Sequence, residues 1–320
     1  MNGMMQRLCA VLVFLGALVL PAMGVGYQPA PGTYAVDSVR YDWHDAARNR
    51  DVPVKIYYPK SGSGPFPVII FSHGLGGSRE GYAYLGQDWA AHGYVCVHLQ
   101  HLGSDQGIFK NGGLLHVDET LRKAIADPQN SINRALDVSF AIDQVEKLNR
   151  DNSLLKNHLD LSRLGMAGHS FGAATTLLVT GEQMRLVTEK YADPRIKAGI
   201  AMSPPMFDDL RFDGIHVPVF VMTGTEDAGF TRTADRRTAF DKITSPGTCL
   251  VVFNGADHMT FSGHLRPGEK AKDDKFHPLI LSATEAFWDA HLRGDAGAKV
   301  WLEQGGFTSR MQEDGKFELK

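Results

Sequence analysis

The chain has 320 residues, of which 43% are hydrophobic and 22% charged, and its formal net charge at pH 7 is −3. This length and composition suit one large α/β domain of ordinary globular character. The near-neutral charge argues against the broad basic surface that nucleic acids or anionic lipids require, so we expect neither as a partner.

The first residues predict a secretory signal. Arg7 precedes an uncharged apolar stretch, residues 8–20, and Pro21-Ala22-Met23-Gly24 then supplies small residues for a cleavage site. The stretch is shorter than the roughly 20 residues that a membrane-spanning helix needs; an uncleaved N-terminal anchor is the alternative. We therefore expect a signal peptide over 1–24, an exported protein without stable membrane insertion, and a single catalytic domain over 25–320.

Strands come first in the mature chain. Alternating apolar and polar residues predict two antiparallel strands, 32–42 and 52–58, with a polar turn over 43–51. The wholly apolar run 66–71 is typical of a parallel strand that helices cover on both faces.

Strands and helices then alternate. The other predicted strands are 94–99, 164–167, 196–202, 216–222 and 249–253. Helices are predicted at 82–92, from Asp127-Pro128 onward, after residue 170, at 233–243 and at 278–292, where Gly294 ends the last one. This alternation predicts βαβ units, and therefore a mainly parallel sheet of eight strands with helices on both faces.

One pentapeptide, Gly168-His169-Ser170-Phe171-Gly172, lies between a predicted strand and a predicted helix. A strand that turns directly into a helix crowds the turn, and glycine at both ends removes the Cβ atoms that would collide. Such a turn strains the serine backbone and exposes its hydroxyl at a helix N-terminus. We interpret Ser170 as a nucleophile; a glycine-flanked serine in an ordinary loop is the alternative. His169 is expected to point away and to pack or shape the cleft.

A second glycine-rich stretch, Ser72-His73-Gly74-Leu75-Gly76-Gly77, follows the apolar strand 66–71. Hydrolases with a serine turn of this kind take one oxyanion donor from such a loop and the other from the residue after the nucleophile. We therefore expect the backbone amides of Leu75 and Phe171 to form an oxyanion hole. A plain glycine-rich turn before a helix is the alternative.

Two further residues complete a catalytic order along the chain. Asp227 follows the predicted strand 216–222 and His258 follows 249–253, which gives nucleophile, acid and base in sequence. A serine hydroxyl is a weak nucleophile at pH 7, so His258 would take its proton while Asp227 fixes the imidazole. Glu226 and Asp208 are the alternative acids, and His258 as a purely structural histidine is the alternative for the base.

The remaining candidates are substrate contacts. His101 follows the strand 94–99 and is expected to line the cleft, while Met206, Phe207 and Phe230 are either acyl-pocket residues or ordinary loop hydrophobes. The pair His98 and His101 lacks the surroundings of a zinc site, so we expect no metal and no cofactor.

Two cysteines remain after the signal segment. Cys96 and Cys249 fall in the middle of separate predicted strands that are not neighbours in the sheet. A disulfide needs Cα atoms within about 7 Å, so we expect two buried free thiols.

The two glycine-rich stretches resemble those of platelet-activating-factor acetylhydrolases, and the chain from Val36 to about Gly294 resembles bacterial predicted dienelactone hydrolases. The resemblance implies an α/β-hydrolase fold, a Ser-Asp-His esterase, and the oxyanion roles of Leu75 and Phe171. Dienelactone hydrolases proper use a cysteine nucleophile, where this chain has Ser170. The acetylhydrolases carry their acid directly after the strand that here ends at Ser203.

Together these patterns predict an exported serine carboxylesterase that hydrolyses small to medium acyl esters, with a small-molecule or lipid ester as substrate. A serine peptidase or amidase on the same fold is one alternative. A non-catalytic binding module that retains the fold is the other.

Overall fold

The computed structural model describes residues 26–110, 116–152, 154–184, 191–207, 209–229, 231–264 and 266–320. The predicted signal segment, 1–24, lies outside these ranges. Within them, every helix is too short or too polar to cross a membrane.

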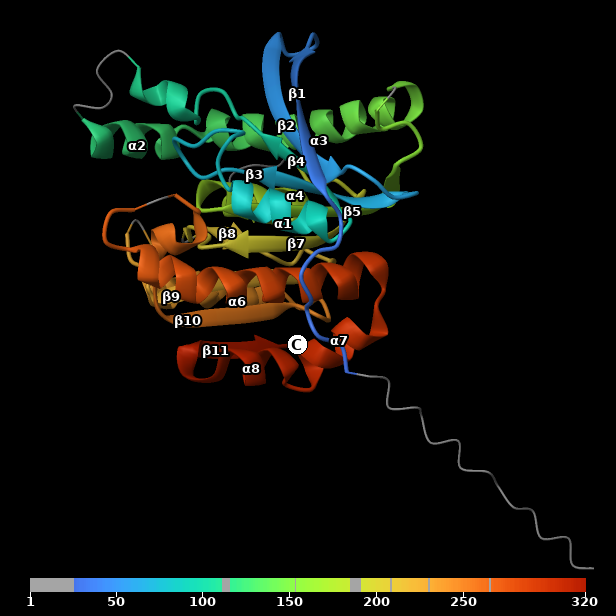
Figure 1. The fold of residues 1–320 in the computed structure, drawn as a ribbon. Coiled ribbons are helices and arrows are strands. Elements are labelled where there is room, and N and C mark those ends of the chain that lie inside the picture. The colour runs from blue at the N-terminus through green and yellow to red at the C-terminus, as the bar shows by residue number, and fades with distance from the viewer. Residues whose placement is uncertain are drawn as a thin grey trace, which may run out of the picture.

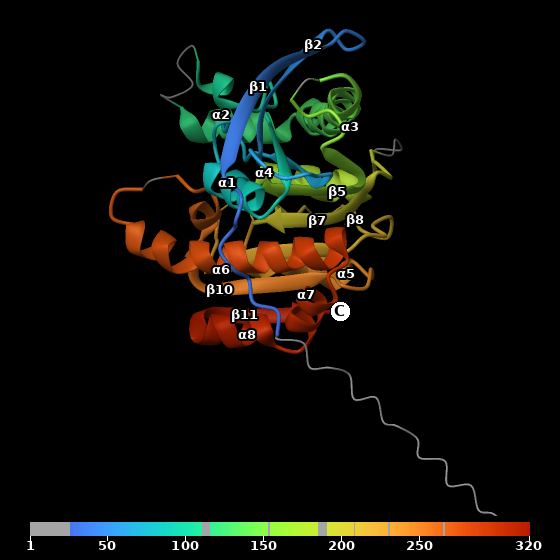
Figure 2. The ribbon, with the colours of Figure 1, turned by 45° about the vertical axis from the view of Figure 1, so that its right-hand side comes forward.

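A nine-stranded sheet runs through the molecule in the order β1-β2-β4-β3-β5-β7-β9-β10-β11 (Figures 1 and 2). Its strands are β1 (Val36–Asp45), β2 (Arg50–Pro59), β3 (Phe66–Ser72), β4 (Val95–Leu99), β5 (Leu159–His169), β7 (Ile196–Met202), β9 (Val219–Glu226), β10 (Cys249–Asp257) and β11 (Gly315–Leu319). The six central strands, β4, β3, β5, β7, β9 and β10, are parallel to one another. At the edges, β1 and β2 on one side and β11 on the other are antiparallel to their neighbours. A second, two-stranded sheet joins β6 (Gln183–Met184) to β8 (Leu210–Arg211).

The mainly parallel α/β architecture is confirmed, and three strand predictions need correction. The sheet has nine strands rather than eight, because β11 pairs with β10 after the last predicted strand. The first hairpin continues to the pair Asp45 and Arg50, so the turn occupies only 46–49 instead of 43–51. Strand β9 begins at Val219 rather than 216, directly after Pro218, which has no N–H to donate to a ladder.

Helices cover both faces of the sheet, as the apolar strand 66–71 predicted. One face carries α1 (Ala83–Ala91), α6 (Lys270–Trp288), α7 (Ala296–Glu303) and α8 (Gly306–Met311); the other carries α3 (Pro128–Asp151), α4 (Phe171–Thr180) and α5 (Thr238–Lys242). Along β3, Ile69 and Phe71 enter the first core, while Val68 and Ile70 enter the second.

The helix ends show which local sequence signals predicted a helix boundary correctly. Asp127 caps α3 by accepting a hydrogen bond from the Gln129 amide at 2.9 Å, as the Asp-Pro signal predicted. The C-terminal helix, predicted over 278–292, instead begins at Lys270 and carries Pro278 in its interior. It ends in a π-helical turn, Asp289–Arg293, before Gly294.

The two cysteines are free and buried, as predicted. Cys96 lies in β4 and Cys249 in β10, with β3, β5, β7 and β9 between them in the sheet. Their positions exclude a disulfide between them.

Candidate active site

The turn between β5 and α4 is as crowded as its two glycines suggest. A Cβ atom on Gly168 would lie 2.2 Å from the carbonyl oxygen of Gly172, and one on Gly172 would lie 1.9 Å from that of Ser72. Ser170, between them, has φ 54° and ψ −118°. Non-glycine residues avoid this conformation, and here the tight turn imposes it.

The structure brings Ser170, His258 and Asp227 together at the carboxyl edge of the sheet. Ser170 Oγ lies 2.9 Å from His258 Nε2, and His258 Nδ1 lies 2.9 Å from Asp227 Oδ1. Each of the three residues directly follows a strand: Ser170 follows β5, His258 follows β10 and Asp227 follows β9. The ends of three parallel strands therefore supply one row of hydrogen-bonded side chains.

Asp227 is fully buried and surrounded by donors. Ser203 Oγ and Thr223 Oγ1 donate to its Oδ2 at 2.6 and 2.7 Å, and Arg236 Nε lies 3.1 Å from its Oδ1. Burial alone raises the pKa of Asp227, but the hydrogen bond from His258 and the charge of Arg236 outweigh it and hold the pKa below its ordinary value. Asp227 is therefore a carboxylate at neutral pH.

The two alternative acids differ in position. Glu226 is exposed and forms an ion pair with Lys272, with 3.1 Å between Oε2 and Nζ. Its side chain is thus directed to solvent rather than to His258. Asp208 lies outside the described residues.

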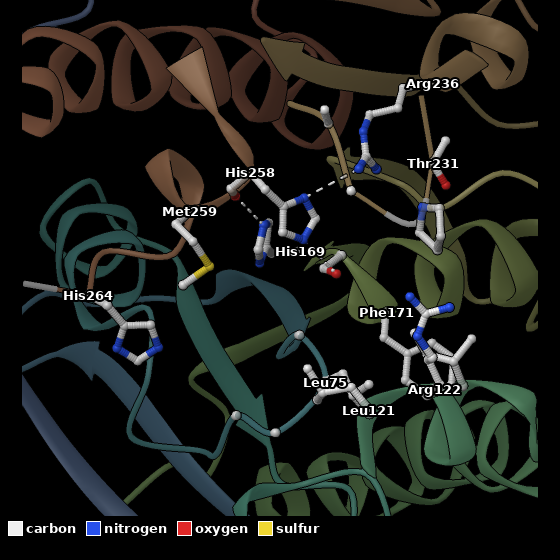
Figure 3. Close-up of a pocket in the computed structure, with 18 of the residues that line it drawn as sticks. Leu75, Leu121, Arg122, His169, Phe171, Thr231, Arg236, His258, Met259 and His264 are labelled. Atoms are coloured by element: carbon white, nitrogen blue, oxygen red, sulfur yellow. Dashed lines mark hydrogen bonds between the residues drawn. The ribbon is translucent and has the colours of Figure 1, made fainter. Parts of the chain in front are cut away.

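The predicted oxyanion donors line the same pocket as Ser170 (Figure 3). Phe171 is the first residue of α4, so its amide points out of the helix N-terminus, where the helix dipole favours negative charge. In the described part of the chain, neither the Leu75 amide nor the Phe171 amide donates to a protein acceptor. Two free N–H groups therefore lie beside the serine.

A bridge that the sequence did not predict joins the oxyanion loop to His258. The carbonyl oxygen of His258 can only accept, so His169 Nε2, 2.8 Å away, carries the proton. His169 Nδ1 then accepts from the Tyr82 hydroxyl at 2.8 Å, and the Tyr82 oxygen accepts from the Gly74 amide at 3.1 Å. Burial holds the pKa of His169 well below its ordinary value, which keeps the ring neutral, as this bridge requires.

The pocket above Ser170 has a volume of about 580 Å³. Its apolar wall combines the oxyanion residues with Leu121 and Ile125 of α2 (Val117–Ala126) and with Phe207, which is 53% exposed. Met259 and His264 lie on the opposite side, beyond His258 (Figure 3). An acyl group attached to Ser170 would therefore meet mostly hydrocarbon.

The four predicted substrate contacts have different outcomes. Phe207 lines the pocket. Met206 does not; it packs against the core beneath α4. His101 is fully buried between Ser72 and Asp137, so its expected place in the cleft is wrong. Phe230 lies outside the described residues.

Sequence reasoning also missed residues that support the site. Arg236, Ser203 and Tyr82 each contact a predicted catalytic or oxyanion element, yet none belongs to a local motif. Of these three residues, only Ser203 had a sequence signal that pointed to the site, because it directly follows a predicted strand.

The sheet order, the covering helices and the strained serine at the sheet edge give the chain the α/β-hydrolase fold. Two family models match parts of it: "Platelet-activating factor acetylhydrolase, isoform II" over residues 43–106 and "PET hydrolase-like" over residues 119–266.

Individual relatives include both acetylhydrolases and cutinases. The chain is 31% identical to the platelet-activating factor acetylhydrolase of Cavia porcellus over 180 residues, which cover 49% of this chain and 39% of the relative. It is 28% identical to cutinase est2 of Thermobifida alba over 205 residues, which cover 64% of this chain and 56% of the relative. The chain thus spans about two fifths to three fifths of these relatives. Their names denote hydrolases, in agreement with the enzyme class that the motifs predicted.

Proposed function

We propose that this protein is a serine carboxylesterase that acts through an acyl-enzyme. The observation that carries the proposal is the continuous row from Ser170 through His258 to buried Asp227, facing the free amides of Leu75 and Phe171. A binding surface needs none of these contacts, so they favour catalysis over a non-catalytic module.

In the proposed mechanism, Ser170 Oγ attacks the ester carbonyl carbon as its proton passes to His258 Nε2. The Leu75 and Phe171 amides stabilise the tetrahedral oxyanion, and Asp227 stabilises the imidazolium. When the intermediate collapses, the ester C–O bond breaks and His258 returns the proton to the leaving alcohol. Water then repeats the sequence on the acyl-enzyme and releases the acid and free Ser170.

The substrate class follows from the pocket. A largely apolar cavity of about 580 Å³ suits a small or medium acyl chain, in a small-molecule or lipid ester. The acetylhydrolase and cutinase names of the relatives support ester hydrolysis. Apart from the ester and water, the proposed reaction uses only side chains and backbone amides of the chain.

The chain organisation remains part of the proposal. We infer one catalytic domain over 25–320 and export directed by the segment 1–24. The charged n-region and the short apolar stretch support export. Mass spectrometry of the exported protein would identify its first residue.

The function is tested with p-nitrophenyl esters of increasing acyl length and with matched p-nitroanilides. We expect ester hydrolysis that is fastest for short or medium chains, and much slower anilide hydrolysis. Ser170→Ala should lower kcat on the best ester by about 10⁴-fold or more. Faster turnover of anilides would indicate a peptidase or amidase instead. A folded parent that hydrolyses neither series would contradict the proposal.

A further inference from the structure

Arg134, on α3, is a buried cation whose hydrogen-bond partners in the described residues are all neutral. Its side chain is fully buried, and among the described residues it forms no ion pair. Arg236, the other buried arginine near the site, contacts Asp227 directly. Burial of a charge without a counter-charge is costly, so such a residue needs an explanation.

Two carboxylates that attract Arg134 through space, Asp137 and Asp105, bind other groups. Asp137 accepts from Arg48, Arg50 and His101, at 2.8 to 3.0 Å. Asp105 accepts from the Gln100 side chain and from the Gly107 amide. Both attract Arg134 through space, but neither neutralises it by contact.

The guanidinium instead binds three neutral groups. Nη2 donates to the carbonyl oxygen of His73, Nη1 donates to Ser104 Oγ at 2.9 Å, and Nε donates to Thr175 Oγ1 at 2.9 Å. Its fixed fork thereby joins the loop after β3, the loop after β4 and helix α4.

Each of these three partners lies next to a proposed oxyanion donor in the chain or is connected to one by a hydrogen bond. His73 directly precedes Gly74-Leu75, and the Ser104 carbonyl accepts from the Gly76 amide at 2.9 Å, which brackets Leu75 on both sides. Thr175 Oγ1 donates to the carbonyl oxygen of Phe171 at 3.0 Å. The guanidinium carbon also lies 4.7 Å from the centre of the Phe171 ring, within cation–π range.

We propose that Arg134 is the positioning residue of the oxyanion hole. It holds the Leu75 and Phe171 amides in a fixed position relative to each other and places a buried positive charge behind them. The inference rests on the proposed esterase function and extends it. A positive charge in a low-dielectric interior favours the oxyanion over the neutral ester. Arg134 therefore acts on kcat more than on KM.

The experiment compares Arg134→Met, which removes the charge, with Arg134→Lys, which retains it. On the best p-nitrophenyl ester, Arg134→Met should lower kcat by about 10- to 100-fold. This loss is smaller than the roughly 10²–10³-fold loss that follows removal of a direct oxyanion donor. The KM of Arg134→Met should stay within about threefold of the KM of the parent. Arg134→Lys should restore a large part of kcat. The inhibition constant of an alkyl trifluoromethyl ketone, which forms an oxyanion on Ser170, should rise in Arg134→Met by a similar factor to the loss in kcat.

A second pair of variants tests the positioning role without removing the charge. Thr175→Val breaks the hydrogen-bonded link from Arg134 to the Phe171 carbonyl, leaves the cation–π contact in place, and should lower kcat by about three- to tenfold. The matched control is Thr180→Val on the same helix. Thr180 bonds back to the Thr176 carbonyl and, among the described residues, accepts no hydrogen bond from an arginine, so kcat should be unchanged. This pair decides the question if Arg134→Met does not fold.

The possible results are distinct. Equal kcat losses in Arg134→Met and Arg134→Lys, or losses confined to KM, would overturn the role of the charge. An unchanged kcat in Thr175→Val would overturn the positioning role. An inactive parent would contradict the esterase proposal and this inference with it, whereas an active parent with an unimpaired Arg134→Met would contradict this inference alone.

Discussion

Two serine–histidine–aspartate sets lie close together in this molecule. Besides Ser170, His258 and Asp227, the Ser72 hydroxyl lies 2.9 Å from His101 Nε2, and His101 Nδ1 lies 3.0 Å from Asp137 Oδ2. The Ser72 set is fully buried and is absent from the pocket lining, whereas Ser170 lies in the pocket beside two free amides. Residue identity and hydrogen bonding therefore do not tell the two sets apart, whereas access from the pocket does.

Also at the scale of single residues, the Tyr82 hydroxyl should matter for turnover. Tyr82→Phe removes the acceptor of the Gly74 amide and the donor to His169, so the oxyanion loop and the base lose their link. We expect kcat to fall about three- to tenfold, because a buried amide left without a partner costs about 1–3 kcal/mol and shifts the loop. Steady-state kinetics on the best ester measure this effect.

Tyr94→Phe is the matched control for Tyr82→Phe. It also deletes a buried tyrosine hydroxyl, which donates to Asp289 Oδ1 at 2.6 Å on the face covered by α6, away from the pocket. Thermal stability should fall while kcat stays constant. If both variants lose stability and neither loses kcat, the bridge has no catalytic effect.

At the scale of elements, Asp137 joins the first hairpin to α3. It accepts from Arg48 and Arg50 at the hairpin end and from His101 beyond β4. Burial alone raises its pKa, but the bonds from His101 and Arg50 outweigh it and lower the pKa to about 2. A lowered pKa stabilises the fold above the unfolded value near 4, and this contribution is lost as pH falls from about 4 to 2.

Asp137→Asn should therefore destabilise the protein at neutral pH by about 2 kcal/mol or more, since it also removes the buried negative charge that Arg50 and Arg48 contact, although Arg48 keeps its ion pair with Asp45. Urea unfolding at several pH values should show the difference from the parent shrinking below pH 4. Asp143→Asn, which removes an exposed carboxylate from the same helix, should cost less than about 1 kcal/mol at either pH. A constant Asp137→Asn penalty at every pH would contradict the linkage.

The helices and strands also show which elements can be predicted from local sequence patterns. Buried parallel strands such as 66–71 carry a continuous apolar signal, and Asp127-Pro128 is a local helix start; both were predictable. Pro278 favours a helix start at that residue, because proline fits the first turn of a helix, but in α6 it lies in the interior, where packing holds the rest of the helix. Strand β11 is five residues long, so its short alternation carries little signal without the neighbouring strand.

In the candidate site, the convergence of Ser170, Asp227 and His258 was predictable, because each follows a strand and parallel strands bring their ends to one edge. Arg134, Arg236 and Tyr82 contact the site from elsewhere in the chain, through packing that no local motif records. His101 follows a strand as well, yet it is buried, so position after a strand does not by itself determine exposure.

At the scale of the whole molecule, β11 completes the sheet at the edge opposite the hairpin (Figure 1). The Phe317 ring centre lies 5.8 Å from that of Phe220 and 5.3 Å from that of Phe307, and Lys320 Nζ donates to the Ile243 carbonyl at 2.8 Å. Deletion of residues 315–320 would expose the edge of β10 and part of the core beneath α8.

We expect this deletion to destabilise the protein by about 3 kcal/mol or more, because it removes the partly buried side chains of Phe317 and Leu319 together with the pairing of β11 to β10. The fraction that remains folded should keep its kcat, because β11 supplies no residue to the pocket. Thermal unfolding and active-site titration measure the two quantities separately. An unchanged unfolding midpoint would show that the sheet does not need its ninth strand.

The proposed esterase requires Ser170, activated by His258, as its nucleophile. Labelling of the folded protein with a fluorophosphonate probe, followed by peptide mass spectrometry, tests it most directly. We predict one probe per chain, on the peptide that contains Ser170, with no label in Ser170→Ala and slow labelling in His258→Gln. A folded parent that takes up no probe, or that carries it on another serine such as Ser72, would contradict the account.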